Sequence, residues 1–267
     1  MTLTICIMGK DGVVLGSDSR ATVGDPRGQT AINEPVKKIF PIGKHAGLGI
    51  AGEGGLGLSI IDDFQKEFSH CGEMSISEIV ERLRLKCTVL YGKWFPHLTP
   101  EDRPGLSLIV AGYTASASSK SEIYALHSYY NFAPIKSTMG FEAIGLPRLA
   151  HYLLNNLYRP EIDVKQAAML TAFCIEETSS QDAKVGADTQ IATFSDSKGY
   201  FDYTKTELDT LKQECSEFRE KMKEQIYGSA IQEPKTGHSP KTGLTKLMNS
   251  SRKQSQRRIS KRRPPRK

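Results

Sequence analysis

Several features that define other classes of protein are missing from this 267-residue sequence. It contains no run of 18 apolar residues, so we expect no membrane-spanning helix and no membrane partner. Its first residues lack the charged and apolar regions of a signal peptide. The five cysteines are odd in number and form no C-x-x-C pair, which argues against a disulfide framework and favours a reducing compartment. The expected location is therefore cytoplasmic.

Motifs for metals and nucleotides are also missing. The six histidines form no H-E-x-x-H pair or similar arrangement of ligands. The glycine-rich segment Ala51–Gly55 is neither a P-loop nor a G-x-G-x-x-G that follows a first strand. We therefore expect no metal site and no cofactor.

The net charge of +6 is a property of the C-terminus and not of the whole chain. Residues 228–267 hold 12 of the 36 Lys and Arg residues but only one of the 30 Asp and Glu residues. This segment is rich in Pro, Gly and Ser and has few apolar residues, a composition that is typical of disorder. The sequence thus predicts a globular domain over residues 1–227 and a basic, disordered tail over residues 228–267.

The tail could attract nucleic acid, because each basic residue can neutralise a phosphate. It has no Phe, Tyr or Trp to stack on bases, however. We therefore favour a solvated extension, or a weak tether for an acidic partner, over nucleic-acid binding.

The apolar periodicity within residues 1–227 predicts strands, two helices, strands, two helices, strands and a final charged helix. Ser75 with Glu78 forms a capping-box pattern, and Asp163 is a candidate N-cap. Two facing sheets with a helix pair outside each would bury every apolar face. We therefore predict an α+β fold, a four-layer αββα sandwich. The expected strands are 2–7, 13–16, 36–42, 45–51, 107–112, 123–126, 189–194 and 200–203, and the expected helices are 56–68, one from 75, 149–158, 164–177 and 206–227.

The chain opens with a β-hairpin whose first strand starts at Thr2. If Met1 is removed, which a small second residue permits, Thr2 has a free α-amino group at the start of a core strand. That amine titrates near pH 7.7–8.0. One residue would then supply both a hydroxyl nucleophile and its base. Alternatively, Thr2 is simply a β-forming residue at a strand start.

Three further segments can complete such a site. The second strand of the hairpin ends at Asp18, which returns it close to Thr2. A positive charge on Lys38, in the next strand, would favour the oxyanion form of a nearby hydroxyl, and Asp18 could orient that lysine. Gly52 lies between a strand and a helix, where a backbone N–H can donate to a developing oxyanion. The alternative for Lys38 is an exposed lysine on an edge strand.

Three stretches together resemble a known family: TLTICIMGKDGVVLGSDSRAT, VKKIFPIGKHAGLGIAGEGG and DAKVGADTQIA. Over roughly residues 2–227 the chain is similar to proteasome β-type subunits of the N-terminal nucleophile hydrolase superfamily. This resemblance implies the same four-layer αββα sandwich, stacked rings and a secluded chamber.

The resemblance also assigns roles by position. Thr2 resembles the catalytic threonine, Asp18 and Lys38 the catalytic aspartate and lysine, Gly52 the oxyanion-hole glycine, and Asp182 the supporting aspartate of a D-x-x-S-G motif. Substrate-binding positions of the family fall on residues that would add an extended peptide to a groove edge or line the first specificity pocket. These substrate-binding residues are Ala21, Thr22, Val36 and Ile50.

The chain departs from the family pattern at two serines. Val185 stands at the serine of D-x-x-S-G, and the Ser-Gly before the third helix is replaced by Gly145-Leu146. The segment from Thr22 to Lys38 is also slightly longer than usual. These departures suit a divergent prokaryotic branch similar to HslV or to the Anbu-type ancestral homologues.

The resemblance implies a threonine-type endopeptidase that acts on peptides or unfolded proteins. Its implied partners are further copies in a homo-oligomeric ring, with an ATPase or an α-type ring as candidates. Two alternatives stay open: a non-catalytic ring subunit that retains the motif, and a small-molecule amidase of the same superfamily.

Overall fold

A computed structural model describes residues 2–25, 28–68, 74–114, 120–195 and 199–228. The chain divides into two compact units, Met1–Arg219 and Glu220–Lys267. Almost all of the predicted tail, residues 228–267, falls outside the described residues, so its disorder stays a prediction. Among the described residues, no helix has both the length and the apolar character needed to cross a membrane.

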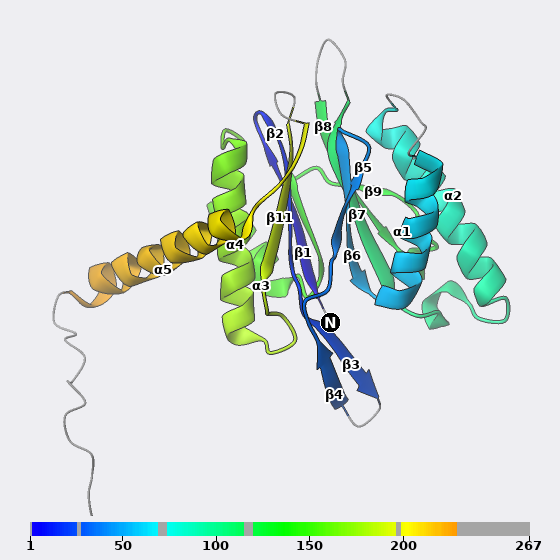
Figure 1. The fold of residues 1–267 in the computed structure, drawn as a ribbon, viewed down its shortest axis with the longest axis horizontal. Helices are drawn as coiled ribbons and strands as arrows, with labels where there is room; N and C mark the ends of the chain where they lie inside the picture. The colour runs from blue at the N-terminus through cyan, green and yellow to red at the C-terminus, as the bar shows by residue number, and fades with distance from the viewer. Residues whose placement is uncertain (1, 26–27, 69–73, 115–119, 196–198, 229–267) are drawn as a thin grey trace, which may run out of the picture. The chain divides into compact units, whose positions relative to one another are not determined.

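Two antiparallel five-stranded sheets form the centre of the first unit (Figure 1). The first sheet has the order β10-β1-β2-β11-β12 and the second the order β5-β6-β7-β8-β9. The strands of the first sheet are β1 (Leu3–Gly9), β2 (Gly12–Asp18), β10 (Phe141–Gly145), β11 (Thr189–Ser195) and β12 (Gly199–Asp202). Those of the second are β5 (Ile39–Ile42), β6 (Ala46–Gly52), β7 (Leu106–Thr114), β8 (Lys120–His127) and β9 (Ile135–Lys136).

A pair of helices covers the outer face of each sheet (Figure 1). Helices α1 (Gly54–Phe68) and α2 (Ile76–Trp94) lie on the second sheet, and α3 (Arg148–Leu157) and α4 (Val164–Gln181) on the first. The chain is therefore the predicted four-layer αββα sandwich, and that prediction is confirmed. A fifth helix, α5 (Lys205–Tyr227), follows the last strand and crosses from the first unit into the second.

Local sequence signals explain the ends of two helices. The predicted capping box of Ser75 with Glu78 starts α2, and the predicted N-cap Asp163 starts α4, where it forms a second capping box with Gln166. In each box the side chain of the N-cap accepts from a backbone N–H that the helix leaves without an intrahelical partner.

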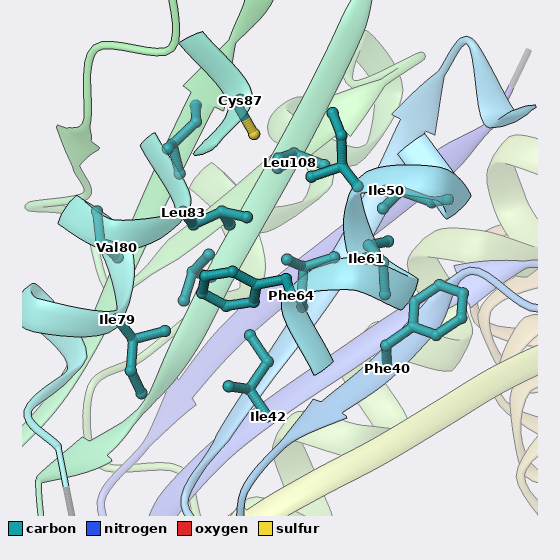
Figure 2. Close-up of a cluster of buried hydrophobic side chains, with 14 of the residues drawn as sticks. Phe40, Ile42, Ile50, Ile61, Phe64, Ile79, Val80, Leu83, Cys87 and Leu108 are labelled. Carbon is teal, nitrogen blue, oxygen red and sulfur yellow. The ribbon is translucent and has the colours of Figure 1, made fainter. Parts of the chain in front are cut away.

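The core between α1, α2 and the second sheet consists of aliphatic and aromatic side chains (Figure 2). Phe64 from α1, Leu83 from α2 and Leu108 from β7 are all fully buried there. This packing holds β6, which ends at Gly52, against the start of α1.

The two sheets approach each other closely because β6 presents glycine where they meet. A Cβ at Gly49 would lie 2.5 Å from Thr4 Cγ2, and one at Gly47 would lie 2.1 Å from the ring of Phe194. The Thr4 hydroxyl donates to the Ile50 carbonyl across this interface at 2.9 Å. The start of β1 and the end of β6 are thereby fixed against each other.

Four strands were not anticipated. Strands β3 (Ala21–Asp25) and β4 (Gly28–Asn33) pair as a separate two-stranded sheet within the segment from Thr22 to Lys38. Strand β10 pairs with β1 as an edge strand, and the two-residue β9 pairs with β8. The predicted strand over residues 36–42 begins only at Ile39.

Candidate active site

The antiparallel order of the strands gathers the predicted site residues at one end of the two sheets. Thr2 precedes β1, and Asp18 ends β2, which pairs with β1. Lys38 directly precedes β5, and Gly52 ends β6. Each of these residues therefore stands at the end of a strand, where a well-ordered backbone meets a loop.

Asp18 and Lys38 form a buried ion pair. Lys38 Nζ lies 2.9 Å from Asp18 Oδ1, and both side chains are almost inaccessible to solvent. The ammonium also donates to the Arg20 carbonyl at 2.5 Å. Burial lowers the pKa of Lys38 below its ordinary value and outweighs the opposing effect of the Asp18 carboxylate.

The Asp18 carboxylate accepts from three backbone N–H groups as well. Oδ1 accepts from Leu3 N at 3.0 Å, and Oδ2 accepts from Gly186 N at 3.1 Å and from Arg20 N at 3.2 Å. Both oxygens are thus saturated by donors, as a buried carboxylate requires. The bond to Leu3 ties this carboxylate to the residue that follows Thr2.

The backbone of Thr2 is held from the other side by the chain after β10. Thr2 O accepts from Leu146 N at 2.9 Å. Gly145 has φ +89°, and a Cβ at that position would lie 1.9 Å from Thr2 O. Only glycine suits this combination of backbone angle and close approach.

Gly52 has φ +104°, and a Cβ there would lie 2.2 Å from Gly105 O. The left-handed backbone at this residue lets the chain turn from the end of β6 into α1. The N-terminus of α1 carries the positive end of the helix dipole. The Gly52 region therefore has a local electrostatic field suited to an oxyanion.

A cavity of about 290 Å³ opens at this end of the sheets. Every predicted substrate-binding residue lines it, and so do three of the predicted catalytic residues, Thr2, Lys38 and Gly52. Thr2 itself is only 6% exposed. The full lining consists of Thr2, Ala21, Thr22, Val36, Lys38, Ile50, Ala51, Gly52, Glu53, Gly54, Gly55 and Leu58.

Asp182 lies apart from this cavity lining. It caps the C-terminus of α4, where its Oδ1 accepts from Lys184 N at 2.9 Å and its carbonyl accepts from Val185 N at 3.0 Å. Val185, at the position of the family serine, is fully buried. Asp182 therefore shapes the turn that delivers the Gly186 N–H to Asp18.

The sequence argument missed Gln190. Its Oε1 accepts from Lys38 N at 3.0 Å, and its Nε2 donates to the Val36 carbonyl at 2.6 Å. It thus fastens the chain before β5 to β11. No local signal marks this glutamine, because its partners lie about 150 positions away in the sequence.

As far as the described residues go, no His or Cys side chain lines this cavity. The described part of the chain contains no group of three or more His, Cys, Asp or Glu side chains that could hold a metal ion. Cys6, Cys87, Cys174 and Cys215 are free and buried, and Cys71 falls outside the described residues.

The fold and the position of this cavity define the class of protein, an N-terminal nucleophile hydrolase fold of the proteasome type. In agreement, residues 2–194 match the family described as "Proteasome subunit". The chain therefore belongs to the proteasome subunit family.

Two curated relatives are distant in sequence. A proteasome subunit beta 1 from Thermococcus onnurineus is 26% identical over 216 residues, which cover 79% of this chain and 96% of the relative. A proteasome subunit beta from Stackebrandtia nassauensis is 25% identical over 195 residues, or 69% of this chain and 65% of the relative. The matched region thus spans just under two thirds of the second relative's length.

Solved structures of Anbu proteins share the fold. The ancestral beta-subunit Anbu from Yersinia bercovieri superposes with a TM-score of 0.68 at 12% identity, covering 84% of this chain and 96% of that one. Anbu from Pseudomonas aeruginosa, solved in a helical assembly, superposes with a TM-score of 0.63 at 18% identity. The match covers 84% of this chain and 96% of that one. The chain is thus a divergent member of the proteasome subunit family, as the sequence resemblance indicated, and it shares its fold with Anbu proteins.

Proposed function

We propose that this protein is a threonine-type endopeptidase that uses the N-terminal Thr2 exposed by removal of Met1. The observation that carries the proposal is the position of Thr2. It lines a 290 Å³ cavity together with Lys38 and Gly52. The Lys38 ammonium is held by an ion pair with the buried Asp18. Family membership supports a peptidase, because the curated relatives are proteasome β subunits.

In the proposed reaction, Thr2 Oγ attacks the carbonyl carbon of a peptide bond and its proton passes to the free α-amine. The Gly52 N–H stabilises the oxyanion of the tetrahedral intermediate. The C–N bond then breaks, and the α-ammonium returns the proton to the departing amine. Water hydrolyses the resulting ester and restores the Thr2 hydroxyl. The Lys38 ammonium favours the alkoxide form of Thr2 throughout.

The proposed enzyme works as a homo-oligomeric ring in the cytoplasm. Ring formation would enclose the cavity, and an ATPase or an α-type ring are its candidate partners. Native mass spectrometry of the purified chain tests this, with a closed oligomer as the expected result.

A non-catalytic ring subunit is the second candidate. It is favoured by Val185, whose buried apolar side chain cannot supply the hydroxyl that the family's serine provides. Under this alternative the Asp18–Lys38 pair is retained for stability alone.

Intact mass and peptide hydrolysis separate the two candidates. The intact mass of the purified protein should correspond to loss of Met1. Hydrolysis of fluorogenic peptides should fall by about a thousandfold or more in Thr2→Ala, since removal of a nucleophile leaves only binding and oxyanion stabilisation. Thr206→Ala, on the exposed face of α5, is the matched control and should retain activity. Equal hydrolysis by wild type and Thr2→Ala would sink the proposed nucleophile.

A further inference from the structure

The cavity beside Thr2 combines apolar walls with a carboxylate. Val36, Ile50 and Leu58 supply aliphatic surface, and Glu53 supplies an acidic group. An apolar lining alone, as expected from Val36 and Ile50, would favour aliphatic side chains of a substrate. A carboxylate among such walls changes which side chain fits best.

The carboxylate of Glu53 also sets the net charge of the lining. The other charged residue there is Lys38, whose ammonium is neutralised by Asp18 at 2.9 Å. Glu53 is exposed, and within the described residues no Lys, Arg or His nitrogen lies within ion-pair distance of its carboxylate. The cavity therefore presents one negative charge that its own residues do not balance.

Glu53 is held in place by its backbone. Its N–H donates to the Gly105 carbonyl at 2.8 Å, and its own carbonyl accepts from Gly57 N at 3.0 Å in the first turn of α1. It directly follows Gly52, the proposed oxyanion donor. The backbone that carries the Glu53 side chain is thus a fixed part of the cavity wall, next to the proposed oxyanion donor.

We propose that Glu53 makes the cavity selective for peptides that carry a Lys or Arg side chain at the position entering it. The aliphatic stem of such a side chain would lie along Val36, Ile50 and Leu58, and its charged end would pair with the Glu53 carboxylate. This inference rests on the proposed peptidase function, because it assigns the substrate class of the same cavity.

Matched peptides test this selectivity. Two fluorogenic peptides that differ only in Lys or norleucine before the cleaved bond share the same stem and differ in the ammonium. Wild type should cleave the Lys peptide with roughly fivefold higher kcat/KM, since a partly exposed ion pair contributes up to about that factor. The ratio should fall to about one in Glu53→Gln and below one in Glu53→Lys. Glu81→Gln, an exposed carboxylate on α2 outside the cavity, should keep the wild-type ratio.

A binding measurement keeps selectivity apart from catalysis. Fluorescence anisotropy of the same two peptides, labelled and added to full-length Thr2→Ala with and without Glu53→Gln, reports affinity without turnover. If the Lys peptide binds more tightly than the norleucine peptide and this preference disappears in Glu53→Gln, the inference is supported. A wild type that cleaves neither peptide would contradict only the peptidase proposal. Cleavage of both peptides with equal efficiency, or equal affinities in Thr2→Ala, overturns the role of Glu53.

Discussion

The Lys38 ammonium lies 2.9 Å from the Asp18 carboxylate, and both side chains are almost inaccessible to solvent. Asp18 ends β2 in the first sheet, and Lys38 directly precedes β5 in the second. The pair therefore joins the two halves of the sandwich at the point where the cavity opens. A buried ion pair is costly to break on one side, because the remaining charge stays desolvated.

Asp18→Asn should accordingly destabilise the protein by about 3–5 kcal/mol, since it leaves the Lys38 ammonium buried without its counter-charge. Urea unfolding monitored by circular dichroism measures this loss. Glu34→Gln is the control, because Glu34 is 39% exposed and pairs with Arg20 at the surface, where an ion pair contributes at most about 1 kcal/mol. A similar decrease in the free energy of unfolding in both variants would show that the buried pair contributes no more to stability than the surface pair.

Peptide hydrolysis should depend on pH in a bell shape. On the acid side the rate should rise as the Thr2 amine loses its proton near pH 7.7–8.0 and becomes a base. On the alkaline side it should fall as Lys38 is deprotonated. Because burial lowers the pKa of Lys38, this fall should begin below the ordinary lysine value of about 10.4.

The alkaline fall should not reflect unfolding caused by Lys38. The unfolded chain holds this proton more tightly than the folded chain, so between the two pKa values the contribution of Lys38 to the free energy of unfolding rises with pH. A profile of kcat/KM, with circular dichroism recorded at each pH, separates the two effects. A rate that still climbs at pH 10.4 would rule out a required Lys38 ammonium.

Gln190→Ala should reduce activity, although Gln190 lies about 150 positions from Lys38 in the sequence. It removes the hydrogen bonds to Lys38 N and to the Val36 carbonyl and leaves both backbone groups without that partner. We expect a loss of about 1–3 kcal/mol in the free energy of unfolding and a lower kcat. Gln181→Ala, an exposed glutamine at the end of α4, is the control for stability and kinetics. An unchanged kcat would show that Lys38 is positioned without Gln190.

Gly145→Ala should displace the start of β1. The added Cβ would lie 1.9 Å from the Thr2 carbonyl, and φ +89° is strained for alanine, at a cost of about 1–3 kcal/mol for the backbone alone. The thermal midpoint and the hydrolysis rate should both fall. Gly92→Ala in α2 should raise the midpoint, since a Cβ there meets nothing within 4 Å and alanine favours a helix by about 1 kcal/mol. Unaltered hydrolysis by Gly145→Ala would show that Thr2 tolerates the shift.

The elements that the sequence predicted well are those with local signals. The first hairpin has alternating apolar residues before a Gly-Lys-Asp-Gly turn and an apolar run after it, and α2 and α4 begin at the predicted capping box and N-cap. The order of these elements then indicated the αββα layers, because that arrangement buries both faces of each sheet.

The elements that it missed depend on distant partners. Strand β10 consists of only five residues and becomes a strand because it pairs with β1, more than 130 positions earlier. Strands β3 and β4 form within a segment that the sequence marked only as longer than usual. Such short strands gain stability from pairing rather than from their own composition.

The sequence by itself determined the layers, the family and the residue types of the proposed chemistry, because strand alternation, caps and the spacing of Thr2, Asp18 and Lys38 are local or pairwise patterns. Only the tertiary structure decided how these residues are held. Segments far apart in the chain supply the N–H groups that donate to Asp18 and the Gln190 hydrogen bonds before β5. A distant segment also supplies Gly145, which lies against Thr2. These contacts depend on strand register and on close packing between distant segments. A local sequence pattern does not contain that information.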